Sequence, residues 1–314
     1  MKAVQIHQYG GPEELKYEDA PEPALQPDEV LIKLYATSIN PVDWKVRNGG
    51  WKDRVNYQFP LILGWDAAGV IEKAGSEVKQ FKVGDAVYGR PDVSKNGTYA
   101  EYVAVKADLL AKKPEKADYL TAASIPLAGL TAWQGLFDHG KLEPDQKILI
   151  HGGAGGVGTF AIQFAKLRHA YVATTASGGN VQFLKDLGAD EVINYKEEKF
   201  EDMLKDFDVV FDTIGGETQK KSVQVLKQGG VLVSTVGIAY EEVLKEKNIR
   251  GVQYMAQSVP KQLDQIAGLL DEGKIQPIIT KVFDLKDMAE AHKVNEEGHT
   301  RGKIVIRIAD QLVK

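Results

Sequence analysis

Cysteine is absent from the 314-residue chain. Its absence excludes disulfides, thiolate catalysis, iron–sulfur clusters and zinc sites built from cysteine. Long apolar runs are also missing, since the longest nearly apolar stretch, residues 120–133, is shorter than the roughly 20 residues of a membrane-spanning helix. The start of the chain lacks the apolar core of a signal peptide. These absences predict a cytoplasmic protein that has no membrane partner.

An excess of positive charge is absent as well. The chain carries 39 Lys and Arg against 44 Asp and Glu, a formal net charge of −5, and has no clustered basic tract. Nucleic-acid binders need such clusters to displace counterions from phosphates, so no nucleic-acid partner is expected. The remaining composition, 43% hydrophobic and 26% charged, is that of a globular protein, and the length favours two domains.

The pattern of apolar residues changes near residue 121. Before it, apolar segments are short, β-branched and interrupted by Gly and Pro, which predicts a mostly β domain over residues 1–120. Residues 121–265 are predicted to form a second domain, and Thr121 is expected to cap its first helix. From Lys147 on, strands alternate with amphipathic helices, which predicts βαβ units and a doubly wound parallel sheet. The pattern leaves open whether the tail, residues 266–314, returns to the β domain, and we expect that it does.

A glycine-rich loop follows the first strand of this series. The segment KILIHGGAGGVGTFAIQFAK, residues 147–166, holds a G-x-G-x-x-G pattern between a strand and a helix. Such glycines permit a tight turn, close approach of the backbone to a pyrophosphate and close packing of helix on sheet. The N–H groups that begin the helix then face the phosphates, as in a Rossmann dinucleotide-binding domain. A glycine-rich turn without a ligand is the alternative. The expected phosphate contacts are Gly155, Gly156 and Val157.

The end of the next strand bears on which nicotinamide cofactor binds. NAD sites usually carry Asp or Glu about 20 residues past the glycines, but residues 174–180 read TTASGGN. Because no carboxylate is present to repel a 2′-phosphate, NADPH is expected rather than NADH. The candidate contacts of that phosphate are Ser177, Asn180, Tyr195, Lys196 and Arg301.

Four residues follow the fourth and fifth strands of the series. Ligands of open α/β sheets lie at the carboxyl ends of the strands, so these residues are expected to border the adenosine or the nicotinamide. Ordinary sheet packing is the alternative. They are Ile214, Val236, Gly237 and Ile238. His151, which ends the first strand, is either an acid or base or a buried histidine with satisfied hydrogen bonds.

The chain as a whole resembles the medium-chain dehydrogenase/reductase superfamily. The stretches that carry the resemblance are SINPVDWK, FPLILGWDAAGVIEKAG, AGLTAWQGLF, the glycine segment and HTRGKIVIRI. It is most similar to the zinc-independent quinone oxidoreductase branch, which includes enone (alkenal) reductases. The resemblance implies an α/β protein with a GroES-like, mostly β catalytic domain and a Rossmann cofactor domain, and it implies a homodimer.

Zinc alcohol dehydrogenases of this superfamily carry metal ligands at three places that can be compared. A Cys follows the strand where this chain has residues 38–40 (Ser-Ile-Asn), a His-Glu pair stands at Trp65 and Asp66, and another Cys falls near Leu127. Asn, Trp and Leu cannot build a tetrahedral site of thiolates and imidazole, so no metal is expected. Trp65 is expected to wall an apolar acceptor pocket or to fill the vacated volume, and Asp66 to anchor its loop.

Further site residues are implied by the same resemblance. Asn40 would lie at the nicotinamide and substrate cleft and orient the acceptor or the cofactor, unless it is only a turn residue before a proline. Asp43 is expected to cap its loop rather than to transfer protons, and Tyr57 is either a phenol donor or a packing residue. Lys45 is either a cofactor contact or a solvated lysine. The other implied cofactor contacts are Thr131, Arg301 and Gly302.

Hydride transfer without a Lewis acid needs an acceptor that is already electrophilic, which disfavours interconversion of alcohols and ketones. Quinones and α,β-unsaturated carbonyls are such acceptors, and one or two hydrogen-bond donors would stabilise the charge that develops on their oxygen. The sequence therefore predicts an NADPH-dependent reductase of quinones or enones. Two alternatives stay open: a cofactor-binding protein without turnover, in a structural or sensing role, and an enoyl-thioester reductase.

Overall fold

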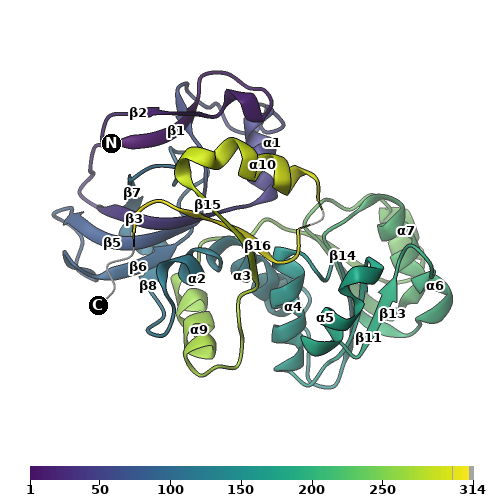
Figure 1. The fold of residues 1–314 in the computed structure, drawn as a ribbon. Coiled ribbons are helices and arrows are strands. Elements are labelled where there is room, and N and C mark those ends of the chain that lie inside the picture. The colour runs from purple at the N-terminus through teal and green to yellow at the C-terminus, as the bar shows by residue number, and fades with distance from the viewer. Residues whose placement is uncertain (299, 311–314) are drawn as a thin grey trace. The chain divides into compact units, whose positions relative to one another are not determined.

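A computed structural model describes residues 1–298 and 300–310 and divides the chain into two units (Figure 1). The first unit joins Met1–Ala128 to the residues from Ser258 on, and the second is Gly129–Gln257. The first unit thus runs past residue 120, where the sequence placed its end, and it resumes before residue 266.

The second unit is built on a parallel sheet with the strand order β11-β10-β9-β12-β13-β14. The chain runs outward from β9 to β11, crosses back to β12 and then runs outward on the other side, which is the doubly wound arrangement of a Rossmann domain. This confirms the predicted fold class for this part of the chain. The strands are β9 (Lys147–His151), β10 (Tyr171–Ala176), β11 (Glu191–Asn194), β12 (Phe207–Asp212), β13 (Leu226–Ser234) and β14 (Arg250–Gln253). The helices are α4 (Gly156–Lys166), α5 (Val181–Asp186), α6 (Phe200–Met203), α7 (Gly216–Val225) and α8 (Glu241–Glu246).

The inner strands of this sheet contain short runs of consecutive apolar residues, as expected where both faces of a sheet are covered. Ile148, Leu149 and Ile150 of β9 are all fully buried, and Leu149 belongs to one core cluster with Val210 of β12. The edge strand β14 has no counterpart in the sequence-based prediction. Most of its residues are exposed, so its sequence, RGVQ, carries little of the apolar signal that marks the other strands.

The first unit contains a larger and a smaller β-sheet. The larger has the strand order β15-β16-β3-β5-β6-β8, with β7 also pairing with β3, and the smaller has the order β2-β1-β4. The larger sheet comprises β3 (Glu29–Ile39), β5 (Ala67–Ala74), β6 (Ala86–Gly89), β7 (Tyr102–Lys106), β8 (Leu110–Lys112), β15 (Ile279–Asp284) and β16 (Lys303–Arg307). The smaller comprises β1 (Lys2–Ile6), β2 (Lys16–Asp19) and β4 (Leu61–Ile62).

Helices cover parts of these sheets and connect them. Within the first unit they are α1 (Pro41–Arg47), α2 (Tyr119–Ala123), α9 (Pro260–Asp271) and α10 (Met288–Glu296), and α3 (Pro126–Trp133) begins in it. The short helical turns of the chain are Pro12–Glu14, Ala107–Leu109, Gln134–His139, Gly178–Asn180 and Leu285–Asp287. The expectation that Thr121 caps a helix is wrong. The cap of α2 is Asp118, whose carboxylate accepts the backbone N–H of Thr121 at 2.7 Å.

Strand β3 positions the start of the candidate site. Its last residue, Ile39, pairs with Ile304 of β16 in antiparallel register, so the C-terminal tail lies against the strand that ends at Asn40. Helix α1 begins immediately after Asn40, and α10 packs against α1 (Figure 1). Within residues 1–298 and 300–310, no helix has the length and apolar character needed to cross a bilayer.

Candidate functional site

In the second unit, the glycine loop leads from β9 into α4. Gly155 is the N-cap of α4, and Gly156 and Val157 begin the helix, all three partly exposed. The first N–H groups of an α-helix have no carbonyl partner within the helix, and the positive end of the helix dipole lies there. The loop therefore offers donors and a favourable potential to an anion, as expected for a pyrophosphate.

Different glycines of this loop are required for different reasons. A methyl group on Gly158 would lie 2.3 Å from the carbonyl oxygen of Gly152, and one on Gly153 would lie 2.0 Å from Thr174 Oγ1. These two residues are glycine because the helix and the sheet pack too closely for a side chain. A methyl on Gly155 would meet only the Gly152 oxygen, at 3.4 Å, which is an ordinary contact. The protein itself therefore leaves room at Gly155 for a ligand.

The fold brings together the residues predicted to contact a 2′-phosphate within the second unit. Ser177 follows β10 and Tyr195 follows β11, and these strands are parallel neighbours with Ala176 opposite Asn194. The Asn180 amide donates to Ser177 Oγ at 3.1 Å. Tyr195 is 52% exposed, so its ring is free of the core and accessible to a ligand. Ser177, Asn180 and Tyr195 thus share the carboxyl edge of the sheet with the glycine loop.

The residues after β12 and β13 lie at the same edge. Ile214 is 56% exposed and Val236 is 43% exposed, which is unusual for apolar side chains that sheet packing alone would bury. Gly237 and Ile238 follow Val236 and are partly buried. Asp212, which the sequence reasoning did not single out, is fully buried and its Oδ1 accepts the N–H of Ile214 at 2.9 Å.

His151 is held in the interior rather than presented to a ligand. It is fully buried, and its two ring nitrogens lie 2.9 Å from Thr175 Oγ1 and 2.8 Å from Ser222 Oγ. Burial lowers the pKa of His151 to about 4, and the charge of Asp212 opposes that shift. Of the two expectations for His151, the structure fits the buried histidine with satisfied hydrogen bonds.

In the first unit, Asp66 joins three segments of the chain. It is fully buried, and its Oδ2 accepts hydrogen bonds from Ser38 Oγ at 2.5 Å and Asn40 Nδ2 at 2.6 Å. Its Oδ1 accepts the backbone N–H of Leu127 at 2.7 Å. Leu127 lies in the first turn of α3, where a carboxylate also meets the positive end of the helix dipole. Asp66 therefore anchors its loop, as the sequence predicted.

A lysine completes this cluster. Lys303 begins β16 and is only 4% exposed, and its Nζ donates to Asn40 Oδ1 at 2.5 Å and to Ile39 O at 2.9 Å. The same nitrogen lies 3.6 Å from Asp66 Oδ2. Burial lowers the pKa of Lys303 below its ordinary value, and the charges of Asp66 and Asp43 oppose the shift. The sequence offers one weak sign of Lys303, a lysine that is followed by three apolar residues in its strand.

The positions compared with zinc ligands therefore bind one another in this chain. Ser38, Asn40 and the backbone of Leu127 all donate to Asp66. Trp65 has no exposed surface and belongs to the core cluster of the first unit, which fits the filling of volume rather than the wall of an open pocket. Among the residues that the structure describes, no group of three or more His, Cys, Asp or Glu side chains is arranged to hold a metal ion.

A second buried chain of hydrogen bonds starts at Asp43. Asp43 Oδ2 accepts from the backbone N–H of Asn40 at 2.7 Å and from Tyr99 OH at 2.6 Å, so Asp43 holds this loop through the capping box of α1, whose N-cap is Asn40. His292 Nε2 lies 3.1 Å from Tyr99 OH, and His292 Nδ1 lies 2.9 Å from the Arg47 guanidinium. Since a guanidinium only donates, Nδ1 accepts and Nε2 carries the proton that is donated to Tyr99.

The charge states of Asp43 and His292 in this series of hydrogen bonds follow from their burial. Burial raises the pKa of Asp43 to about 7, and the hydrogen bonds from Tyr99 and the Asn40 backbone oppose the rise. Burial lowers the pKa of His292 to about 3, and the charge of Arg47 lowers it further. His292 is therefore neutral at physiological pH, and Asp43, which accepts the Asn40 backbone N–H directly, changes its charge near neutrality.

Three more residues named from the sequence, Tyr57, Lys45 and Thr131, make contacts within the protein. Tyr57 is 6% exposed and donates its hydroxyl to Val93 O at 2.9 Å, which fits the packing alternative. Lys45 lies in α1 with its Nζ 5.5 Å from the centre of the Trp44 ring. Thr131 lies in α3, and its carbonyl accepts Tyr254 OH at 2.5 Å.

Arg301 and Gly302 immediately precede β16 in the first unit. Arg301 is partly exposed, and its carbonyl accepts the Thr280 hydroxyl at 2.6 Å. A methyl group on Gly302 would lie 2.2 Å from Ile278 O, and its φ of +62° is left-handed. Backbone packing therefore requires glycine here whether or not a cofactor is near, and the role of both residues as cofactor contacts stays a prediction.

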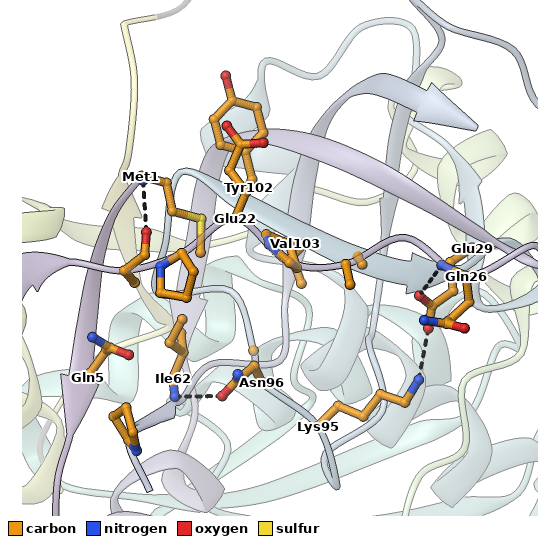
Figure 2. A pocket seen from close by; sticks show the side chains of 17 residues that line it. Met1, Gln5, Glu22, Gln26, Glu29, Ile62, Lys95, Asn96, Tyr102 and Val103 are labelled. Atoms are coloured by element: carbon orange, nitrogen blue, oxygen red, sulfur yellow. Dashed lines mark hydrogen bonds and ion pairs between the residues drawn. The ribbon is translucent and has the colours of Figure 1, made fainter. Parts of the chain in front are cut away.

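The first unit also contains a cavity of about 540 Å³ (Figure 2). Its wall includes Glu29, which is 3% exposed and pairs with Lys95 Nζ at 2.8 Å, and Asn96, which accepts the N–H of Ile62 at 3.0 Å. None of the predicted site residues lines it. The size of a cavity alone gives it no place in the site described above.

Comparison with known protein families gives two matches. Residues 26–115 match the family described as alcohol dehydrogenase GroES-like domain, and residues 187–306 match the family described as zinc-binding dehydrogenase. The GroES-like match covers most of the larger sheet of the first unit, and it confirms that part of the predicted fold.

Similar proteins share nearly the full length of the chain. An NAD(P)H oxidoreductase, RTN4IP1, mitochondrial, from Danio rerio is 35% identical, over 99% of this chain and 92% of the relative. An NADPH-dependent alkenal/one oxidoreductase, chloroplastic, from Arabidopsis thaliana is 37% identical, over 98% and 79%. The structure of the quinone oxidoreductase from Coxiella burnetii is 38% identical with a TM-score of 0.93, over 98% and 99%.

Proposed function

The chain belongs to the medium-chain dehydrogenase/reductase superfamily, among its quinone and alkenal oxidoreductases, and from this premise we propose that it transfers hydride from NADPH to quinones or α,β-unsaturated carbonyls. The observation that carries the proposal is the glycine loop between β9 and α4. Its packing excludes side chains at Gly153 and Gly158 but leaves space at Gly155, which is the arrangement that close approach of a pyrophosphate requires. When bound, the cofactor supplies the hydride.

The chain's own residues divide the binding of the cofactor among them. Gly155, Gly156 and Val157 hold the pyrophosphate at the start of α4. Ile214, Val236, Gly237 and Ile238 border the adenosine or nicotinamide at the carboxyl edge. Support for this role is the exposure of Ile214 and Val236, whose apolar surfaces otherwise stay in water. Thr131, Lys45, Arg301 and Gly302 are the further contacts that we propose.

NADPH is proposed over NADH on the residues that follow β10 and β11. Ser177, Asn180 and Tyr195 offer hydroxyl and amide groups at one edge, and Lys196 adds an exposed cation. The segment from Ser177 to Asn180 contains no carboxylate that would repel a 2′-phosphate. The name of the Arabidopsis relative, which specifies NADPH, points the same way.

Asn40 is the residue that we propose for orienting the acceptor. Its side chain is fixed by Asp66 and Lys303, and because Asp66 takes only one of its two N–H donors, the second is the donor that we propose for the acceptor. A donor that is fixed in advance stabilises the charge that develops on a carbonyl oxygen without reorganisation. Quinones and enones need no more activation than this, because conjugation already makes them electrophilic.

The test is an acceptor screen on the purified protein. NADPH oxidation is measured with a panel of quinones and enones, and a background without protein is subtracted. The proposal expects turnover with at least one acceptor type, and NADPH bound about tenfold more tightly than NADH, a difference of about 1.4 kcal/mol. Tight NADPH binding without turnover on either type would favour a cofactor-binding protein instead.

Two further expectations from the sequence remain predictions. A cytoplasmic location is proposed for this chain, although its relatives include mitochondrial and chloroplastic proteins. A homodimer is proposed as well, and sedimentation of the purified protein at micromolar concentration tests it.

A further inference from the structure

Lys303 stands at the centre of the buried cluster in the first unit. It begins β16, which pairs with β3 so that Ile304 lies opposite Ile39, and its side chain reaches the residue that follows Ile39. Only 4% of Lys303 is exposed, and two of the three N–H groups of its ammonium donate to Ile39 O and Asn40 Oδ1. A buried ammonium is costly unless it is paired, so this placement calls for a reason.

The two neighbours of Asn40 allow its amide one orientation only. Asn40 Oδ1 accepts from the ammonium of Lys303, which has no acceptor, and Asn40 Nδ2 donates to the carboxylate of Asp66, which has no donor. Rotating the amide by half a turn would set the NH₂ against the ammonium and the carbonyl against the carboxylate. Both new contacts would be repulsive, so the donor at Lys303 and the acceptor at Asp66 together select the orientation of Asn40.

The backbone of the same residue is fixed separately. Its N–H donates to Asp43 Oδ2 at 2.7 Å, and Asp43 is held in turn by Tyr99. The Asn40 N–H is therefore held by Asp43 and not by Lys303, although Lys303 also donates to the preceding carbonyl, Ile39 O. Loss of Lys303 should remove its bonds to Ile39 O and Asn40 Oδ1 and leave the Asp43 anchor of the loop in place.

We propose that Lys303 is a positioning residue that holds the Asn40 side-chain amide in the single orientation used to bind the acceptor. The inference rests on the proposed function, in which Asn40 touches the acceptor. Lys303 acts through its hydrogen bond to Asn40 Oδ1, and the paired charge of Asp66 keeps the ammonium in place. A role limited to balancing the charge of Asp66 is the competing account.

A matched pair of variants separates the two accounts. Lys303→Met removes both the charge and the donor, and Lys303→Gln removes the charge but keeps an N–H donor for Asn40 Oδ1. Lys281→Met, on the exposed face of neighbouring β15, is the control for changing a lysine near this sheet edge. For each variant, kcat and KM are measured with the best quinone or enone, and the Kd of NADPH is measured by fluorescence titration.

Positioning predicts that Lys303→Met lowers kcat by about 100-fold, the size of effect that misplacing one group by about an ångström produces. Lys303→Gln should keep most of the wild-type kcat, and the Kd of NADPH should stay within about threefold in both. Equal losses in the Met and Gln variants would overturn positioning in favour of charge balance. A Lys303→Met protein with wild-type kcat would overturn it as well.

A measurement on the unchanged protein guards against variants that do not fold. In protein labelled with ¹⁵N on asparagine, the side-chain amide of Asn40 should exchange its hydrogens about 100-fold more slowly than that of exposed Asn248. Equal exchange rates would show that the Asn40 amide is not held, and would overturn the inference. Wild-type protein without turnover on any acceptor rejects the proposed function instead, and the amide exchange distinguishes that outcome.

Discussion

Two glycines of the same loop should respond to the same substitution in opposite ways. In Gly158→Ala the new methyl lies 2.3 Å from the carbonyl oxygen of Gly152, a backbone atom that cannot move aside cheaply. Overpacking of this kind costs about 1 to 3 kcal/mol of the free energy of unfolding. In Gly155→Ala the methyl meets the same oxygen at 3.4 Å, and the backbone φ of −76° suits alanine.

Gly155→Ala should therefore change the free energy of unfolding by less than about 1 kcal/mol, because its poorer N-cap is offset by lower entropy of the unfolded chain. Its effect should fall on the cofactor, since the methyl occupies the space that the pyrophosphate needs. We expect the Kd of NADPH to rise at least about tenfold, a loss of about 1.4 kcal/mol.

The assay combines urea unfolding with fluorescence titration of NADPH on both variants and the wild-type protein. The expected pattern is a stable Gly155→Ala protein that binds poorly and a Gly158→Ala protein that is less stable. Unchanged NADPH affinity in a folded Gly155→Ala protein would refute the reasoning that the loop approaches the pyrophosphate at Gly155.

Three further predictions concern Asp43, Ser177 and Asp66. Asp43→Asn should remove a pH dependence: the pKa of Asp43 is about 7 when folded and near 3.8 when unfolded, so its stabilising contribution is complete below pH 3.8 and lost as pH rises through 7. From pH 5 to pH 8 the wild-type free energy of unfolding should fall by about 2 to 3 kcal/mol relative to the variant, and parallel curves in urea melts would contradict this. Ser177→Asp should weaken NADPH about tenfold or more and leave NADH nearly unchanged, because the new carboxylate repels only a 2′-phosphate, and equal titration shifts for both cofactors would exclude Ser177 from that contact. Chelation should leave turnover unchanged, since Asp66 already accepts three hydrogen bonds, and a loss restored by zinc would overturn that view.

The parts of the fold that the sequence predicts are those with local signals. The alternation of strands and helices from Lys147 on can be predicted from the pattern of neighbouring apolar residues. The glycine loop can also be predicted locally, because the spacing of its glycines reflects the close packing of α4 on the sheet. Asp66 was found for a different reason, because its position could be compared with a metal ligand. Strand β14 escaped prediction because an exposed edge strand carries little apolar pattern.

The buried polar contacts of the first unit have no local signal. Lys303 meets Asn40 across 263 positions of the chain, and His292 meets Arg47 across 245. Nothing in the few residues around a lysine or a histidine shows that the fold will bury it against a distant partner. Only the pairing of β16 with β3 and of α10 with α1 brings these groups together. The orientation of Asn40 could therefore not be predicted, although Asn40 itself was.

The measurement that tests the central claim most directly is NADPH oxidation in the presence of a panel of quinones and enones, with NADH run in parallel. The proposed function predicts turnover with at least one acceptor, faster with NADPH than with NADH, and sensitive to Gly155→Ala. Oxidation no faster than the background without protein for every acceptor, in a protein that binds NADPH, would contradict the account.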